Sequence, residues 1–257
     1  MTAADDWLRT DIGASTPEAI TVRGRDLATE LMGRVTFTEL TFLLVSGRMP
    51  SDGETRLLDA VLGSLADHGL TPTVLAARLT YTGAPEALQG AIAAGLLGAG
   101  TVFLGVVEDT ATFLNGILGD LGSEPSEDAL REGARRAVRA AVDKGRRVPG
   151  LGHPIHKVQD PRTPRIYAIA DATGQLGPHL RLLELVAEAH REATGKALPV
   201  NGAGVAGAAL TDLGFSPALV RGFALLARTA GLVGHLAEEM ERPLGMRLYR
   251  EVDQRAK

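Results

Sequence analysis

Val148-Pro149-Gly150-Leu151-Gly152-His153-Pro154-Ile155-His156-Lys157 is the most informative segment of the sequence. It lies in a run, residues 145–164, that contains four prolines and lacks a helical period. Gly150 and Gly152 allow backbone N–H groups to approach a ligand closely. Because a loop of this length inside a compact domain is usually functional, we place the ligand site here.

Basic side chains are concentrated in and around this loop. Asp143 and Asp160 are the nearby acids that oppose them. The basic residues are Lys144, Arg146, Arg147, His153, His156, Lys157, Arg162 and Arg165. An Arg fork fits a carboxylate and a Lys meets a phosphate as a point charge, so the composition favours a small molecule with several negative charges. The alternative is a solvated loop whose charges pair with acidic helices.

The spacing His153-x-x-His156 also invites a metal interpretation. No Asp, Glu or Cys stands beside it at ligand spacing, and a metal site needs three or four protein ligands. We therefore expect no metal here.

The composition of the chain excludes several classes of function. The 257 residues suffice for one large domain or two modest lobes. A net charge of −4 argues against nucleic acid and anionic membranes as partners, and no apolar run reaches the roughly 18–20 residues of a membrane span. The absence of cysteine excludes disulfides and thiolate sites, and residues 1–6 lack the pattern of a signal peptide, so we expect a cytoplasmic protein.

The rest of the chain is typical of an all-α protein, because apolar residues recur with helical period and alternating strands are hard to find. Capping signals mark several helix starts: the box Ser51-x-x-Glu54, Ser126, and Ser216 followed by Pro217. The expected helices are 52–69, 86–100, 127–144, 178–194 and 217–241, with a turn at 119–125 and the loop at 145–164. The Ala/Gly-rich helix 86–100 permits close helix contacts, either in the centre or at a subunit interface.

Five motifs, taken in order, resemble the citrate synthase superfamily, and most closely its short branch of citryl-CoA lyase type. The basic loop with Asp160-Pro161-Arg162 is similar to the family's P-G-x-G-H … D-P-R signature. The other four are Ala66-Asp67-His68, Ala76-Ala77-Arg78, residues 227–235 (ARTAGLVGH) and Arg247-Leu248-Tyr249-Arg250.

The resemblance implies an all-α homodimer with a large helical domain, residues 1–104 and 215–257, and a smaller CoA-binding domain, residues 105–214. It implies coenzyme A, as a thioester substrate, held by Val148, Pro149, Gly150, Leu151, Gly152 and Lys157. It implies carboxylate-binding groups at His68, His153, Arg162 and Arg228. We also expect Arg78 and His156 to contact the substrate, and His153, His68 and Asn201 to form the catalytic set.

Each assignment has a plainer alternative. His68 is compatible with a role limited to complementing a helix C-terminus. Arg162 has acidic neighbours with which it can form an ion pair, and Arg228 is compatible with a solvated position on a helix. Arg78 is compatible with a role in orienting helices, and His156 with a role in packing. His235 lies on an apolar helix face, so we interpret it as a hydrogen-bonded structural histidine.

The sequence departs from the family pattern at two catalytic positions. The family's enolate-stabilising histidine aligns with Phe103, and its proton-abstracting aspartate aligns with Ala203. No His lies between His68 and His153, and no Asp or Glu lies between Glu192 and Asp212, so a shift of one position restores neither group. A missing general base typically costs a factor of about 10²–10⁴ in rate. Glu108 and Asn201 are the candidate substitutes.

Two hypotheses follow. The first is an enzyme of citryl-CoA lyase or citrate synthase type that breaks or forms a C–C bond beside a carboxylate-bearing acyl-CoA thioester, with thioester hydrolysis as a variant. The second is a non-catalytic or regulatory protein that binds CoA and a carboxylate.

Overall fold

The computed structural model describes residues 10–122 and 125–257. The acidic segment 1–6 and part of the turn expected at 119–125 lie outside these residues. The helices are α1 (Phe37–Ser46), α2 (Asp52–Ala66), α3 (Pro72–Gly83), α4 (Leu88–Leu97), α5 (Gly105–Leu121), α6 (Glu127–Asp143), α7 (Arg162–Ala172), α8 (Pro178–Thr194), α9 (Gly202–Asp212), α10 (Pro217–Glu241) and α11 (Gly245–Arg255). The expected all-α class is confirmed, and no described helix is both long and apolar enough to span a membrane.

Local capping chemistry sets the helix starts that the sequence predicted. Ser51 and Glu54 form the reciprocal capping box of α2, and Ser126 Oγ accepts a hydrogen bond from Ala129 N at the start of α6. Ser216 is the N-cap residue of α10, but its side chain makes no capping hydrogen bond, so Pro217 in the first turn is the local signal for this start.

Four helices differ from the predicted boundaries. Helix α4 covers Leu88–Leu97 and is shorter than the expected 86–100 at both ends, with Gly98 as its C-cap. Helix α2 ends at Ala66 because Asp67 is extended and its carboxylate accepts Gly69 N, an Asx turn that leads the chain away. Helix α5 continues through Gly119 to Leu121, where Gly122 at φ +85° ends it. Helix α7 starts at Arg162, before Pro164, since a proline in the first helical turn removes no intrahelical hydrogen bond.

A small antiparallel sheet near the N-terminus is absent from the predictions. Its strands are β1 (Gly13–Ser15), β2 (Ile20–Val22) and β3 (Arg25–Asp26), in that order, with Gly13 opposite Val22 and Thr21 opposite Asp26. A single π turn, η2 (Leu27–Leu31), follows. The strands are too short to show an alternating pattern.

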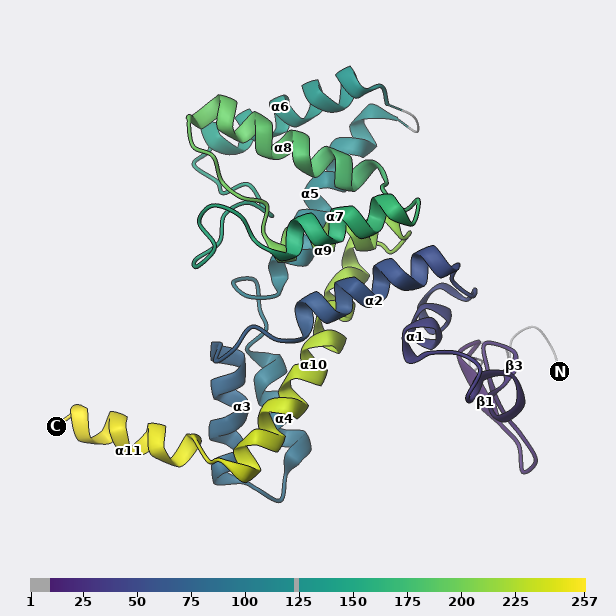
Figure 1. The fold of residues 1–257 in the computed structure, drawn as a ribbon, viewed down its shortest axis with the longest axis vertical. Helices are drawn as coiled ribbons and strands as arrows, with labels where there is room; N and C mark the ends of the chain where they lie inside the picture. The colour runs from purple at the N-terminus through teal and green to yellow at the C-terminus, as the bar shows by residue number, and fades with distance from the viewer. Residues whose placement is uncertain (1–9, 123–124) are drawn as a thin grey trace, which may run out of the picture.

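The helices pack around one large core and one small core (Figure 1). The large core joins α2, α5, α6, α8, α9 and the first half of α10, and α9 is almost wholly buried in it. The small core joins α3, α4 and the second half of α10 through Val74, Ala77, Ala91, Leu232 and Leu236. Helix α10 therefore links the two.

The division into domains at residues 104/105 and 214/215 stays a prediction. Helices α5 to α9 gather at one end of the molecule in Figure 1, as that division requires. Buried side chains also continue across the boundary, since Leu57 and Val61 of α2 belong to the same core as Val205 of α9.

Candidate active site

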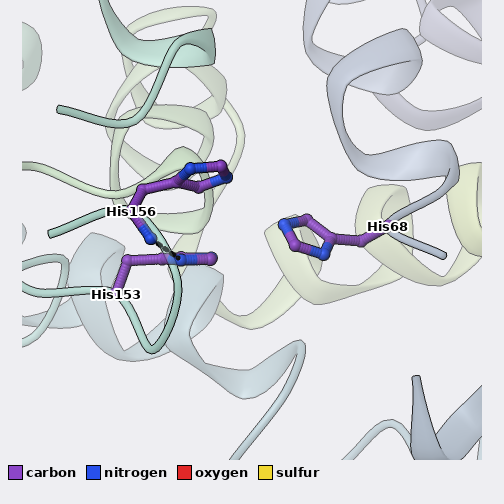
Figure 2. A group of neighbouring side chains, drawn as sticks. All are labelled: His68, His153 and His156. Carbon is purple, nitrogen blue, oxygen red and sulfur yellow. Dashed lines mark hydrogen bonds between the residues drawn. The ribbon is translucent and has the colours of Figure 1, made fainter. Parts of the chain in front are cut away.

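Three histidines from two distant segments lie together. His153 and His156 come from the loop between α6 and α7, and His68 comes from the turn after α2. The rings of His153 and His156 stack with centroids 4.5 Å apart, and the His68 ring lies 5.3 Å from the first and 5.8 Å from the second. Figure 2 shows the His68 side chain pointing toward the stacked pair. The structure thus brings together three of the side chains predicted from sequence.

Backbone contacts fix residues 148–157, here called the Gly-Pro loop, which carry His153. Gly152 N donates to Pro199 O at 2.7 Å, and Asn201 N donates to Gly150 O at 2.9 Å. Gly150 and Gly152 take φ values of +82° and +80°, which only glycine adopts readily. A Cβ on Gly204 would come within 2.5 Å of Gly150 Cα, so the first turn of α9 lies directly against the loop.

The two polar atoms of the Asn201 side chain connect this loop to the start of α9. Its Oδ1 accepts Gly204 N at 2.8 Å as the cap of α9, and its Nδ2 donates to Gly152 O at 2.8 Å. Asn201 therefore positions the loop, and its predicted catalytic role is not needed to explain its presence.

Asp160 and Arg162 form a second anchor of the loop. Arg162 Nε and Nη2 donate to the two carboxylate oxygens of Asp160 at 3.0 and 2.7 Å, and Gly202 N donates to the same carboxylate at 2.8 Å. Burial alone would raise the pKa of Asp160, but these hydrogen bonds outweigh it and hold that pKa well below its usual range. The third nitrogen of Arg162, Nη1, donates to Ser64 O at 3.3 Å, so its guanidinium already has internal partners.

Arg228 is a buried cation without a carboxylate partner among the described residues. It is 6% exposed, and its Nη2 donates to Leu65 O at 3.1 Å and its Nη1 to Thr71 Oγ1 at 3.4 Å. Its Nε is buried and has no hydrogen-bond partner within residues 10–122 and 125–257. Burial lowers the pKa of Arg228, with the Arg162 charge adding to the effect and Asp67 opposing it. A buried, unpaired guanidinium is costly in a protein, and an anionic ligand would offset that cost.

Arg78 is engaged elsewhere. It is 2% exposed, pairs with Glu239 at 2.9 Å, contacts Glu238, and its Nη2 lies 2.9 Å from His235 Nδ1. His235 Nε2 in turn meets Asp67 Oδ1 at 2.8 Å. This network ties α3 and α10 to the residue before His68, and it matches the structural interpretation of His235. The substrate contact expected of Arg78 gains no support from these partners.

The remaining predicted residues lie around the loop. Val148 is buried in the large core, and Pro149 and Leu151 are half-buried. Lys157 is exposed, and its Nζ donates to His153 O at 3.1 Å. Phe103 is 43% exposed in the turn before α5, and Ala203 is half-buried in the first turn of α9. Glu108, considered as a substitute carboxylate, pairs with Arg221 at 2.7 Å.

Sequence reasoning missed the role of Asp67. Its carboxylate holds both Gly69 N and His235 Nε2, and so sets the chain direction at His68. The available signal was its place inside the Ala66-Asp67-His68 motif, where only the histidine was assigned.

Comparison with known proteins agrees with this geometry. The profile of the family "Citrate synthase, C-terminal domain" matches residues 50–252. The chain belongs to the citrate synthase family. The structure of citryl-CoA lyase from Hydrogenobacter thermophilus superposes with a TM-score of 0.82 at 31% identity, covering 92% of this chain and 88% of that one. The expected membership of the citryl-CoA lyase-like branch is therefore confirmed.

Two further relatives place this branch within the citrate synthase family. A citrate synthase of Haloferax volcanii is 24% identical over 199 residues, which are 77% of this chain and 50% of that protein. The chain thus spans about half the length of this curated relative. The structure of ATP citrate lyase from Methanothrix soehngenii, in complex with citrate and coenzyme A, has a TM-score of 0.75 at 23% identity and covers 91% of this chain and 39% of that one, which shows a shared fold.

Proposed function

We propose that this protein is an enzyme of citryl-CoA lyase type that cleaves, or in reverse forms, the C–C bond beside an acyl-CoA thioester bearing carboxylates. The observation that carries the proposal is Arg228, whose buried Nε has no hydrogen-bond partner among the described residues and whose charge interacts with Asp67, next to His68, and with Arg162. A substrate carboxylate supplies the anion that this group lacks.

His153 is suited to polarise the substrate oxygen. Its Nδ1 accepts backbone N–H groups from Ile155 at 3.1 Å and His156 at 3.0 Å. Burial lowers the pKa of His153, and the neighbouring His156, Arg162 and His68 lower it further against the opposing charge of Asp160. The ring is therefore neutral near pH 7 with its proton on Nε2, where it donates to a carbonyl or alkoxide oxygen.

The CoA end of the substrate is assigned to the Gly-Pro loop and Lys157. Lys157 is exposed, so its ammonium group can meet a phosphate as a point charge. Support comes from the Methanothrix soehngenii relative, which was solved with citrate and coenzyme A. His68 and Arg228 then hold the carboxylate end. Arg162 contributes positive charge there while its hydrogen bonds remain with Asp160 and Ser64.

The test is a cleavage assay with citryl-CoA, following oxaloacetate release with malate dehydrogenase and acetyl-CoA by chromatography. We expect turnover by the wild type, and a loss of about 10²-fold or more in kcat/KM for Arg228→Gln and for His153→Gln. Free CoA without acetyl-CoA would instead indicate thioester hydrolysis.

A second candidate function is ligand binding without catalysis. Phe103 and Ala203, at the family's histidine and aspartate positions, favour it. Isothermal titration calorimetry with CoA and with citrate separates the two: binding together with no turnover of citryl-CoA would replace the enzyme proposal by the binding one.

A further inference from the structure

Ring nitrogens of the three imidazoles lie close enough together to contact one oxygen atom. One ring nitrogen from each of His68, His153 and His156 lies within 4.8 Å of the other two. Three points no farther apart than this lie within about 2.8 Å of a common point, which is a hydrogen-bond length to oxygen. Figure 2 shows the rings arranged on either side of that point.

The position of the ring proton on His153 limits what this residue can do at the oxygen. Its Nδ1 receives N–H groups from Ile155 and His156, and a backbone N–H can only donate. The single proton of the neutral ring is thus on Nε2. His153 can donate to the substrate oxygen but cannot take a proton from it.

The same contact argues against a metal ion at the three histidines. A histidine that binds a metal normally donates its other ring N–H to an acceptor, whereas His153 Nδ1 accepts two donors. The sequence could not show that His68 lies beside His153 and His156, because it is distant along the chain. With this third imidazole included, the hydrogen bonds to His153 Nδ1 lead to the same expectation of no metal.

His68 and His156 have different neighbours. Arg228 and Arg162 both donate to carbonyls of the last turn of α2, at Leu65 and Ser64, directly before His68. This places His68 at the carboxylate end. His156 lies in the Gly-Pro loop beside Lys157, on the side assigned to the thioester. No described residue is a hydrogen-bond partner of the His156 ring nitrogens.

We propose that His156 is the proton-transfer residue of this enzyme, in place of the carboxylate that Ala203 lacks. The inference rests on the proposed function and adds a catalytic residue to it. In the cleavage direction, a ring nitrogen of His156 takes the proton of the substrate hydroxyl while His153 Nε2–H donates to the same oxygen. The O–H electron pair forms the C=O bond, the C–C bond breaks, and its electrons move into the thioester enolate. The His156 imidazolium then returns the proton to the enolate carbon, so atoms and charge balance.

The groups around His156 leave its ring nitrogens open to the substrate. The titratable and charged groups around it are His153 and Lys157 in its own loop, Asp160 and Arg162 at the start of α7, and His68 after α2. Lys157 donates to His153 O and Asp160 is paired with Arg162, so both charges are engaged away from the His156 ring.

The kinetic test compares His156→Ala and His156→Gln with a matched loop control, Val158→Gln, whose native side chain is 92% exposed two residues away. With citryl-CoA we expect kcat to fall about 10²–10⁴-fold in both His156 variants while KM changes little. We expect Val158→Gln to match the wild type. Added imidazole should restore part of the kcat of His156→Ala.

A second measurement separates this inference from the proposed function. Long-range ¹H–¹⁵N correlation spectra of the ¹⁵N-labelled protein report the tautomer of each ring without any substrate. We expect His153 to be protonated on Nε2, and His156 to have a ring nitrogen that carries no proton. If the wild type fails to turn over citryl-CoA but shows these states, the proposed reaction fails and the assignment of donor and acceptor stands.

Three outcomes would overturn the inference. They are a His153 ring protonated on Nδ1, a His156→Ala variant with wild-type kcat, and loss of activity on dialysis against 1,10-phenanthroline that Zn²⁺ restores. The last would show that the cluster is a metal site.

Discussion

At the scale of single residues, the site depends on side chains that hold the backbone of the loop. Asp160 is fully buried, and its carboxylate accepts N–H groups from Arg162 and Gly202. Removing one partner of a buried ion pair leaves the other charge without compensation, which costs about 3–5 kcal/mol.

The Asp160→Asn variant should therefore lose about 3 kcal/mol of unfolding free energy at pH 7. Because the pKa of Asp160 is depressed in the folded protein, its contribution is present above the usual Asp pKa of about 3.9 and declines as pH falls below it. Urea denaturation at pH 7 and pH 3 measures this, with exposed Asp171→Asn as control. An equal deficit at both pH values would contradict the prediction.

The sequence revealed the chemistry of these residues but not their partners. It identified His153, Arg162, Arg228 and Asn201 because the motifs are local. It could not reveal that Asn201 holds Gly152 O or that Arg228 leaves Nε free, since these depend on contacts between segments 49 or more positions apart. The same limit left unstated that His68, itself predicted, would lie against His153 and His156.

At the scale of elements, close approach between α10 and the end of α2 places His68. A Cβ on Gly231 of α10 would lie 2.0 Å from Ala66 O, the last residue of α2. Gly234, one turn farther along the same helix, is exposed, and a Cβ there would have no neighbour within 4 Å. The two glycines thus differ in what an added side chain would meet.

Gly231→Ala should displace Asp67 and His68, lower the melting temperature, and weaken citrate binding by about tenfold or more, because a shift of roughly 1 Å at a positioning contact is costly. Gly234→Ala should instead gain up to about 1 kcal/mol from helix propensity and bind normally. Thermal unfolding and calorimetry with citrate test the pair. Equal behaviour of the two variants would contradict the role of this contact.

Helix starts were predictable where a cap or proline fixes them locally, as at Ser51, Ser126 and Ser216. Helix α9 was not predicted, because an almost wholly buried Ala/Gly helix has no polar face and therefore no amphipathic period. The short strands β1 to β3 were missed for the related reason that three residues cannot display a period.

At the scale of the whole molecule, α11 projects away from the body (Figure 1). Gly245 is its one buried residue, and Met246, Tyr249 and Val252 are 40%, 60% and 60% exposed at helical spacing. Leu97 at the end of α4 is 87% exposed. Apolar surfaces of this kind mark contacts with another chain.

The expected homodimer remains a prediction, and these faces support it. Light scattering coupled to gel filtration at micromolar concentration should give twice the chain mass for the wild type and a lower mass for Tyr249→Glu/Val252→Glu. Glu251→Gln, on the same helix, should stay dimeric. A wild type that elutes with the mass of one chain would contradict the prediction.

The location of Arg228, His68 and His153 on three separate segments has a thermodynamic consequence. Arg228 lies 163 positions from its hydrogen-bond partner Leu65, so the binding site forms only when these two distant segments are folded together. A ligand that touches all three segments binds the native state alone, and mass action then raises stability by RT ln(1 + [L]/Kd), about 2.7 kcal/mol at a hundredfold excess over Kd. Citrate should therefore raise the temperature of global unfolding in proportion to the logarithm of its concentration, and Arg228→Gln should abolish the rise. A small dicarboxylate or tricarboxylate would therefore stabilise the fold of the entire chain and not only the site that binds it.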